Sequence, residues 1–147
     1  MSILKHRVRW ALRRVPILDD TNRGFWTAGR HDVLRLHRCP SCGFWVYPPR
    51  PICPKCWQRD LPWEATSGRA TLFSFTVNRK PWNPEVDVPY VIGIVELAEQ
   101  PGLTMTTNIV NCSLEELCIG MPLRVIFEQQ DGHFIPLFEP DRFGHTP

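Results

Sequence analysis

The stretch CPSCGFWVYPPRPICPKC, residues 39–56, holds two Cys-x-x-Cys pairs that are separated by ten residues. In each pair a proline follows the first cysteine and fixes one backbone φ, and Gly43 can adopt the positive φ that turns amides toward the sulfurs. This spacing is typical of two knuckles that close around one tetrahedral metal ion. Four thiolates at about 2.3 Å suit Zn²⁺ and leave no open position, so we expect a structural zinc that catalyses nothing. The predicted ligands are Cys39, Cys42, Cys53 and Cys56.

Three other uses of these cysteines compete with zinc. Iron accepts the same four thiolates, and the sequence does not separate the two metals. Paired disulfides require an oxidising compartment, whereas the N-terminal residues contain no apolar stretch long enough for a signal peptide, which favours a cytoplasmic location. A redox-active pair needs only one motif at the start of a helix, and here two occur among prolines. Zinc is therefore the preferred interpretation.

The composition predicts one compact body with a small satellite. The chain has 147 residues with 43% hydrophobic content, enough to bury a core of ordinary size. Its 15 prolines and nine glycines favour short strands joined by turns over a helical bundle. No apolar run reaches the length of about 18 residues that a membrane-spanning helix needs, so we expect no membrane contact.

Positive charge gathers at the N-terminus, where the first 18 residues hold five basic residues and no acidic one. The remainder, with 12 basic and 15 acidic residues, carries about −3. The folded part therefore lacks a basic surface strong enough to hold nucleic acid. We expect the N-terminal segment to be either a flexible arm or an amphipathic helix. The apolar face of such a helix would consist of Leu4, Val8, Leu12 and Val15.

A short helix and then a strand are expected between residues 19 and 38, before the first knuckle. Thr21 or Asn22 is a suitable N-cap for this helix. Phe25 and Trp26 are too large to leave in water, so they either pack on the metal module or anchor another subunit. Residues 33–38 alternate apolar and polar side chains, as a ribbon strand should.

Strand-forming residues dominate the sequence beyond the knuckles. In the first of these strands, Phe73, Phe75 and Val77 are expected to share one face. Ser113 and Glu116 match a capping box that begins a short helical turn. The predicted strands are residues 69–80, 89–98, 102–111, 121–128 and 133–138. Three strands, a short helix and two more strands make the element order of a five-stranded OB barrel.

The order of several short motifs resembles the zinc-ribbon OB-fold proteins that accompany acyl-CoA enzymes, a family long described as a domain of unknown function. The resemblance covers nearly the whole chain from about residue 16. Each motif is weak alone, but their order is specific. The motifs are Phe25-Trp26, Leu34 to Cys42, Pro48-Pro49-Arg50, Ser67-Gly68, Phe75-Thr76-Val77, Val95-Glu96-Leu97, Ile119-Gly120-Met121-Pro122 and Pro136-Leu137-Phe138.

This resemblance implies a mainly β chain that contains a rubredoxin-like zinc ribbon and an OB barrel. We place an N-terminal helical segment at 1–32, the ribbon at 33–64, the barrel at 65–140 and a tail at 141–147. The resemblance also implies a non-catalytic partner of thiolases, hydroxymethylglutaryl-CoA synthases, steroid side-chain aldolases or acyl-CoA hydratases. In that family the OB domain lies beside the CoA site of the partner enzyme.

Two sets of residues beyond the four cysteines are candidates for function. Arg79, Lys80 and Trp82 follow the first barrel strand, where a cation pair beside an indole could meet CoA phosphates and adenine. The competing interpretation is a solvated loop with Trp82 packed on the barrel. Cys112 precedes the expected helical turn, where a thiol can become nucleophilic, although a buried, inert thiol is the commoner case.

Three of the six tryptophans, Trp45, Trp57 and Trp63, lie in or just after the ribbon. A ribbon this small cannot bury all of them, so we expect some to form the seam with the barrel and others to anchor a partner. The sequence as a whole predicts an accessory subunit of a thiolase-like acyl-CoA enzyme, either a thiolase or a retro-aldolase of steroid or fatty-acyl metabolism. The alternative is a single-stranded nucleic-acid-binding module, which the charge distribution disfavours.

Overall fold

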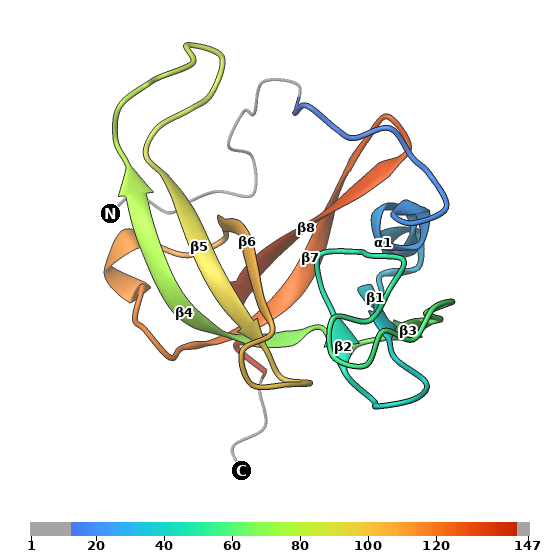
Figure 1. The fold of residues 1–147 in the computed structure, drawn as a ribbon. Coiled ribbons are helices and arrows are strands. Elements are labelled where there is room, and N and C mark those ends of the chain that lie inside the picture. The colour runs from blue at the N-terminus through green and yellow to red at the C-terminus, as the bar shows by residue number, and fades with distance from the viewer. Residues whose placement is uncertain (1–12, 144–147) are drawn as a thin grey trace.

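The computed structural model describes residues 13–143 and places a small ribbon unit beside a β-barrel (Figure 1). Leu4, Val8 and Leu12 of the expected N-terminal helix lie outside the described residues, and Val15 lies in a segment without helix. This segment is tied to the barrel. The amide of Arg13 donates to Gln130 Oε1 at 2.9 Å, and Gln130 Nε2 donates back to the Arg13 carbonyl at 2.7 Å.

The ribbon unit opens with two short helical elements and continues into a three-stranded antiparallel sheet of order β2-β1-β3. Its elements are α1 (Arg23–Thr27), η1 (Ala28–His31), β1 (Arg35–Arg38), β2 (Trp45–Val46) and β3 (Trp63–Ala65). The helix and strand expected before the first knuckle are therefore confirmed.

The start of α1 differs from the expectation in one detail. Asn22 occupies the N-cap position, but its side chain makes no capping hydrogen bond to the helix. Its Oδ1 accepts the amide of Asp19 at 2.9 Å instead, and Asp19 Oδ1 accepts the amides of Thr21 and Asn22 at 2.9 Å each. Asp19 therefore organises the turn, because its short carboxylate reaches the amides of the residues that follow it.

The second unit is a closed barrel of five strands in the order β4-β5-β6-β8-β7. Its elements are β4 (Arg69–Asn78), β5 (Tyr90–Leu97), β6 (Thr104–Ile109), η2 (Leu114–Glu116), β7 (Pro122–Gln130) and β8 (His133–Pro140). β4 and β7 pair to close the barrel, and the parallel pairing of Ile109 with Phe138 joins β6 to β8. The mainly β class and the OB element order are thus confirmed, as is the turn at η2, where Glu116 Oε2 accepts the amide of Ser113 at 2.7 Å.

One expectation for β4 is wrong. Phe73 does not share a face with Phe75 and Val77, because the pairing register with β5 shifts between Leu72 and Ser74. At such a bulge one extra residue enters the strand and the inward face changes from even to odd positions. Leu72 is therefore buried, Phe75 and Val77 pack against the core, and Phe73 is 57% exposed.

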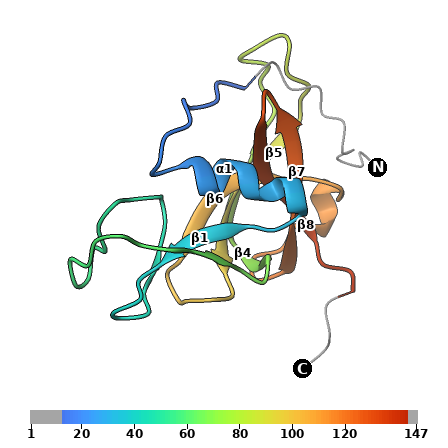
Figure 2. The same ribbon diagram turned by 90° about the vertical axis from the view of Figure 1, so that its right-hand side faces the viewer.

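One continuous hydrophobic core joins the ribbon to the barrel. Phe25 of α1, Leu34, Leu36 and Trp45 belong to the same cluster of buried side chains as residues from the barrel strands. Figure 2 shows α1 lying across the barrel beside β8, which both α1 and η1 contact. Phe25 and Trp26 accordingly pack in this seam, where the rings of Phe25 and Tyr47 lie 5.5 Å apart.

Gln100, in the turn between β5 and β6, adds a polar connection to this seam. Its Oε1 accepts the amide of Trp45 at 2.9 Å, and its Nε2 donates to the Trp45 carbonyl at 3.2 Å. One side chain thus satisfies both backbone groups of a residue in β2.

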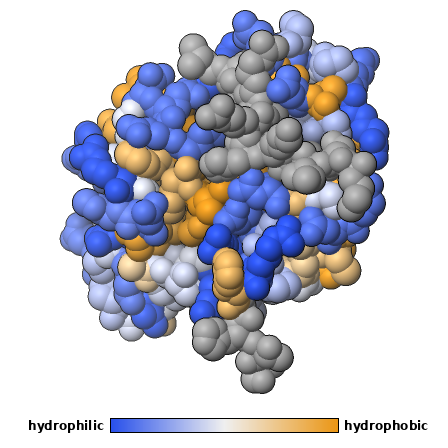
Figure 3. Space-filling view, turned by 180° about the vertical axis from the view of Figure 1, so that it is seen from behind, coloured by the Kyte–Doolittle hydropathy of each residue, from blue (hydrophilic) through white to orange (hydrophobic). Residues whose placement is uncertain are grey.

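The surface behind the view of Figure 1 is mostly hydrophilic, with a small group of apolar residues near its centre (Figure 3). Across residues 13–143, every helix is too short or too polar to cross a bilayer.

Candidate functional site

Two similar turns hold the four cysteines at the tip of the ribbon. After β1, the amide of Cys39 donates to the Phe44 carbonyl and the amide of Gly43 donates to the Cys39 carbonyl, both at 2.9 Å. In the second turn the amide of Cys53 donates to the Gln58 carbonyl at 2.9 Å, and the amide of Trp57 donates to the Cys53 carbonyl at 3.0 Å. Each turn thus brings the two sulfurs of its Cys-x-x-Cys pair to one side.

The geometry of the sulfurs fits a single tetrahedral ion. All four Sγ atoms lie within 4.8 Å of one another, with Cys39 and Cys56 at 3.4 Å and Cys42 and Cys53 at 3.7 Å. A zinc ion with four sulfurs at about 2.3 Å requires sulfur–sulfur separations of about 3.8 Å. The residues present therefore fit a structural Zn²⁺, which would hold the two turns together and leave no position for substrate.

The protonation of this cluster also favours a cation. Burial opposes ionisation of Cys39, but hydrogen bonds from the backbone of Cys42 and Ser41 and from neighbouring thiols lower its pKa to about 6. The amide of Phe44 favours a thiolate at Cys42, yet burial and the adjacent sulfurs together raise its pKa to about 12. Four adjacent sulfurs cannot all carry negative charge without a counterion, and a divalent cation would supply it.

The two turns differ at the residue that follows each pair. Gly43 has a φ of 74°, and Trp57 in the equivalent position has a φ of 65°. Glycine adopts this left-handed conformation freely, whereas a bulky side chain there costs on the order of 1–3 kcal/mol. The backbone is therefore strained at Trp57 in the second turn and relaxed at Gly43 in the first.

Arg79, Lys80 and Trp82 lie in the loop between β4 and β5, at the far end of the barrel from the ribbon (Figures 1 and 2). The Lys80 ammonium lies 4.2 Å from the centre of the Trp82 ring, and Trp82 Nε1 donates to Asn78 Oδ1 at 3.2 Å. Trp82 is 72% exposed, so it does not pack on the barrel. The structure thus brings a cation and an exposed indole together, while Glu85 and Asp87 in the same loop offset the positive charge.

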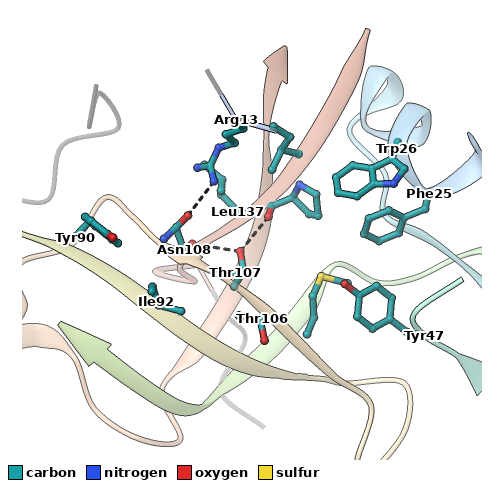
Figure 4. A pocket seen from close by; sticks show the side chains of 13 residues that line it. Arg13, Phe25, Trp26, Tyr47, Tyr90, Ile92, Thr106, Thr107, Asn108 and Leu137 are labelled. Atoms are coloured by element: carbon teal, nitrogen blue, oxygen red, sulfur yellow. Dashed lines mark hydrogen bonds between the residues drawn. The ribbon is translucent and has the colours of Figure 1, made fainter. Parts of the chain in front are cut away.

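A cavity of about 310 Å³ opens between α1, β5, β6 and β8 (Figure 4). One wall is aromatic and consists of Phe25, Trp26 and Tyr47. Burial raises the pKa of the Tyr47 hydroxyl, which therefore stays neutral. No motif in the sequence signals this cavity, because its lining comes from six segments that lie far apart in the chain.

The opposite end of the cavity is polar. Arg13 Nη1 donates to Asn108 Oδ1 at 3.2 Å, and Arg13 Nη2 forms an ion pair with Glu128 at 3.3 Å. Thr107 Oγ1 donates to the Pro136 carbonyl at 2.9 Å. These groups bond to one another in a network that can orient an apolar guest but that contains no nucleophile with an adjacent base.

Of the three histidines in residues 13–143, His37 and His133 contact backbone carbonyls rather than a serine or cysteine. His133 is buried, with its Nε2 2.8 Å from the Pro16 carbonyl and its Nδ1 3.0 Å from the Asp131 carbonyl. His37 stacks on Trp63 at 3.6 Å, with its Nε2 3.3 Å from the Thr21 carbonyl. Both rings thus serve as structural contacts of the N-terminal segment and the seam.

Cys112 is buried rather than poised for reaction. Its exposed fraction is 1%, and burial, together with the nearby Glu116 carboxylate, raises its pKa to about 11. A thiol with this pKa is ionised in only about one molecule in a thousand at pH 8, so Cys112 is a poor nucleophile.

Alkylation of the zinc-loaded protein should separate the two cysteines outside the metal cluster. With iodoacetamide at pH 8, we expect Cys118, which is exposed, to react at least about 100-fold faster than Cys112. Peptide mass spectrometry measures both rates, and unfolding in guanidinium should make them equal. Equal rates in the folded protein would contradict this assignment.

Comparison with known proteins gives matches of three kinds: family models, relatives and a solved structure. Residues 26–62 match the family model described as "ChsH2, rubredoxin-like zinc ribbon domain", and residues 63–128 match "ChsH2, C-terminal OB-fold domain". A DUF35 domain-containing scaffold protein of Methanocaldococcus jannaschii is 38% identical over 100 residues, which are 65% of this chain and 69% of that protein. A probable enoyl-CoA hydratase alpha subunit of Thermomonospora curvata is 31% identical over 131 residues, which are 88% of this chain.

This chain spans 40% of the length of that hydratase subunit. Among solved structures, a chain of an Ltp2-ChsH2(DUF35) aldolase aligns with a TM-score of 0.75 at 28% identity. The alignment covers 86% of this chain and 98% of the matched chain.

Proposed function

Because this chain belongs to the DUF35 family of zinc-ribbon OB-fold accessory proteins, we propose that it is a non-catalytic accessory subunit of a thiolase-like acyl-CoA enzyme. The observation that carries the proposal is the alignment of ribbon and barrel together with nearly the whole matched chain of an aldolase complex. The role of the ribbon is then to fix a docking surface, and that of the barrel is to lie beside the active site of the partner.

The proposed partner is a thiolase or a retro-aldolase that forms or cleaves carbon–carbon bonds in steroid-CoA or fatty-acyl-CoA substrates. Two observations support this class. The aligned complex is an aldolase, and a relative that includes a similar region is named as a hydratase subunit for an enoyl-CoA. Within residues 13–143, Cys112 is buried and His37 and His133 bond to backbone carbonyls, which supports assigning the reaction to the partner.

Association can be tested directly. The tagged chain is expressed in its own host, the co-purifying protein is identified, and the complex is rebuilt from the two purified components. We expect a stoichiometric complex with an acyl-CoA enzyme, and an increase in that enzyme's stability or activity when this chain is present. A chain that binds no such enzyme, and that is instead retained on an oligonucleotide column in a salt-dependent way, would overturn the proposal.

We further propose that Arg79, Lys80 and Trp82 contribute to the acyl-CoA site of the assembled enzyme. The geometry that supports this is the ammonium of Lys80 over one face of an exposed indole. The cations suit the phosphates of CoA, and the free face of the indole suits its adenine.

Replacing both Arg79 and Lys80 by alanine should raise the KM of the assembled enzyme for acyl-CoA about tenfold and leave kcat unchanged. Two exposed phosphate contacts together contribute about 1.4 kcal/mol to the free energy of acyl-CoA binding, which corresponds to a tenfold change in affinity. Steady-state kinetics of the rebuilt complex measure it. The charge-matched control is Arg23→Ala with Arg35→Ala, which removes two cations from α1 and β1. An unchanged KM in the loop variant would remove these residues from the site.

A further inference from the structure

The left-handed backbone position of the second knuckle is occupied by a tryptophan. Among the described residues, five non-glycine residues have a positive φ, and four of them are aspartate or asparagine. Those two residue types tolerate the conformation because their short side chains bond to the local backbone. Trp57, with a φ of 65°, has no such compensation, and the equivalent residue of the first knuckle is Gly43.

The side chain of Trp57 does not stabilise this chain either. It is 76% exposed, it is absent from the hydrophobic clusters, and it has no hydrogen bond or ring contact with another described residue. Trp45 and Trp63, by contrast, pack in or against the core that joins ribbon and barrel. A strained backbone that presents an unused indole is typical of a binding function rather than of folding.

The surroundings of Trp57 indicate the chemistry of what it meets. Arg50, Lys55 and Arg59 are exposed around the second knuckle, and Asp60 is the single acidic residue between positions 50 and 60. None of these three cations forms an ion pair within residues 13–143. Since the Lys55 ammonium lies 5.0 Å from the centre of the Phe44 ring, Arg50 and Arg59 are the exposed cations without such a partner that lie near Trp57 in the sequence.

We propose that Trp57 is an anchor that inserts into an apolar pocket with an acidic rim on the acyl-CoA enzyme subunit. The inference rests on the proposed function, which supplies the partner, and it adds the residue through which this chain attaches. The turn fixes the backbone of Trp57, which directly follows the metal-cluster residue Cys56 and donates its amide to the Cys53 carbonyl. Because the turn already fixes this backbone, docking costs only the conformational entropy of the Trp57 side chain.

Three substitutions separate the ring from the backbone conformation. Trp57→Gly and Trp57→Asn remove the ring and suit the left-handed backbone, whereas Trp57→Phe keeps an aromatic ring and the strain. For the zinc-loaded chain alone, we expect Trp57→Gly to raise the Tm by about 3 °C. For the rebuilt complex, we expect Trp57→Gly and Trp57→Asn to raise the Kd at least about 30-fold, and Trp57→Phe to raise it less than about fivefold.

Two further variants serve as controls. Phe143→Gly removes an aromatic ring of similar exposure, 78%, from the C-terminal end, and should leave the Kd within about twofold. Arg50→Ala with Arg59→Ala tests the acidic rim: it should slow association and flatten the dependence of the association rate on salt. An association rate that does not change with these two residues would exclude an acidic rim.

The outcomes distinguish this inference from the proposed function. If the wild-type chain binds the enzyme and Trp57→Gly binds within about threefold of it, the inference is overturned and the proposed function stands. If the Tm of Trp57→Gly falls, the indole stabilises its own chain and the inference is also overturned. If the wild-type chain binds no acyl-CoA enzyme, the proposed function fails and the inference fails with it.

Discussion

Removal of the metal should unfold the ribbon while the barrel keeps its strands. The ribbon tip has a small apolar cluster of its own, made of Cys39, Val46, Cys53 and Leu61 with Phe44 against it. Two of these residues are metal ligands, so the cluster loses its centre when the ion leaves. A structural zinc site of this kind contributes on the order of 10 kcal/mol to the free energy of folding. No other contact of the knuckles replaces this contribution. The barrel retains the core formed by its five strands.

Hydrogen exchange and elemental analysis together measure this effect. We expect about one zinc per chain, and loss of amide protection across residues 39–61 after chelation or in Cys53→Ser. Protection in β4 to β8 should persist. Cys118→Ser is the matched control, because Cys118 is exposed and lies outside the metal cluster. Full protection of the ribbon in metal-free protein, or four cysteines recovered as cystines, would contradict the prediction. Bound iron in place of zinc would preserve the fold and give a coloured protein.

Gly29→Ala should produce a large loss of stability for a conservative change outside the metal site. A Cβ at this position would overlap the Phe127 ring and would lie 2.5 Å from the Cβ of Phe134. Gly29 is buried in η1, and its backbone lies directly against the β7–β8 hairpin. The Phe134 Cβ cannot move away without displacing the backbone of β8, so we expect the free energy of unfolding to fall by about 3 kcal/mol.

Thermal unfolding tests this expectation. A loss of about 3 kcal/mol corresponds to a Tm lower by about 10 °C for a chain of this size. Arg23→Ala, on the exposed face of the neighbouring helix α1, should change the Tm by less than about 2 °C. A Tm of Gly29→Ala equal to that of the wild type would show that the helix does not need this close approach to the barrel.

The elements that the sequence predicts well are those set by spacing and order. The interval between the two Cys-x-x-Cys pairs determines that the sulfurs meet, and the run of strands around a capped turn determines the barrel. The bulge at Phe73 could not be predicted, because an alternating pattern of apolar residues contains no sign of an extra residue. The cavity lined by Phe25, Trp26 and Tyr47 was likewise missed, since it exists only after α1 packs on the barrel.

The side chain of Gln100 closes the outer edge of the ribbon sheet. Trp45 pairs with Arg38 of β1 on one side, and on the other side its amide and carbonyl are both taken by the carboxamide. An uncovered edge would present these two groups as a template for any passing extended peptide. With the edge sealed here, self-association by strand addition is blocked on this side, and contacts that other molecules make with β2 must rely on its side chains.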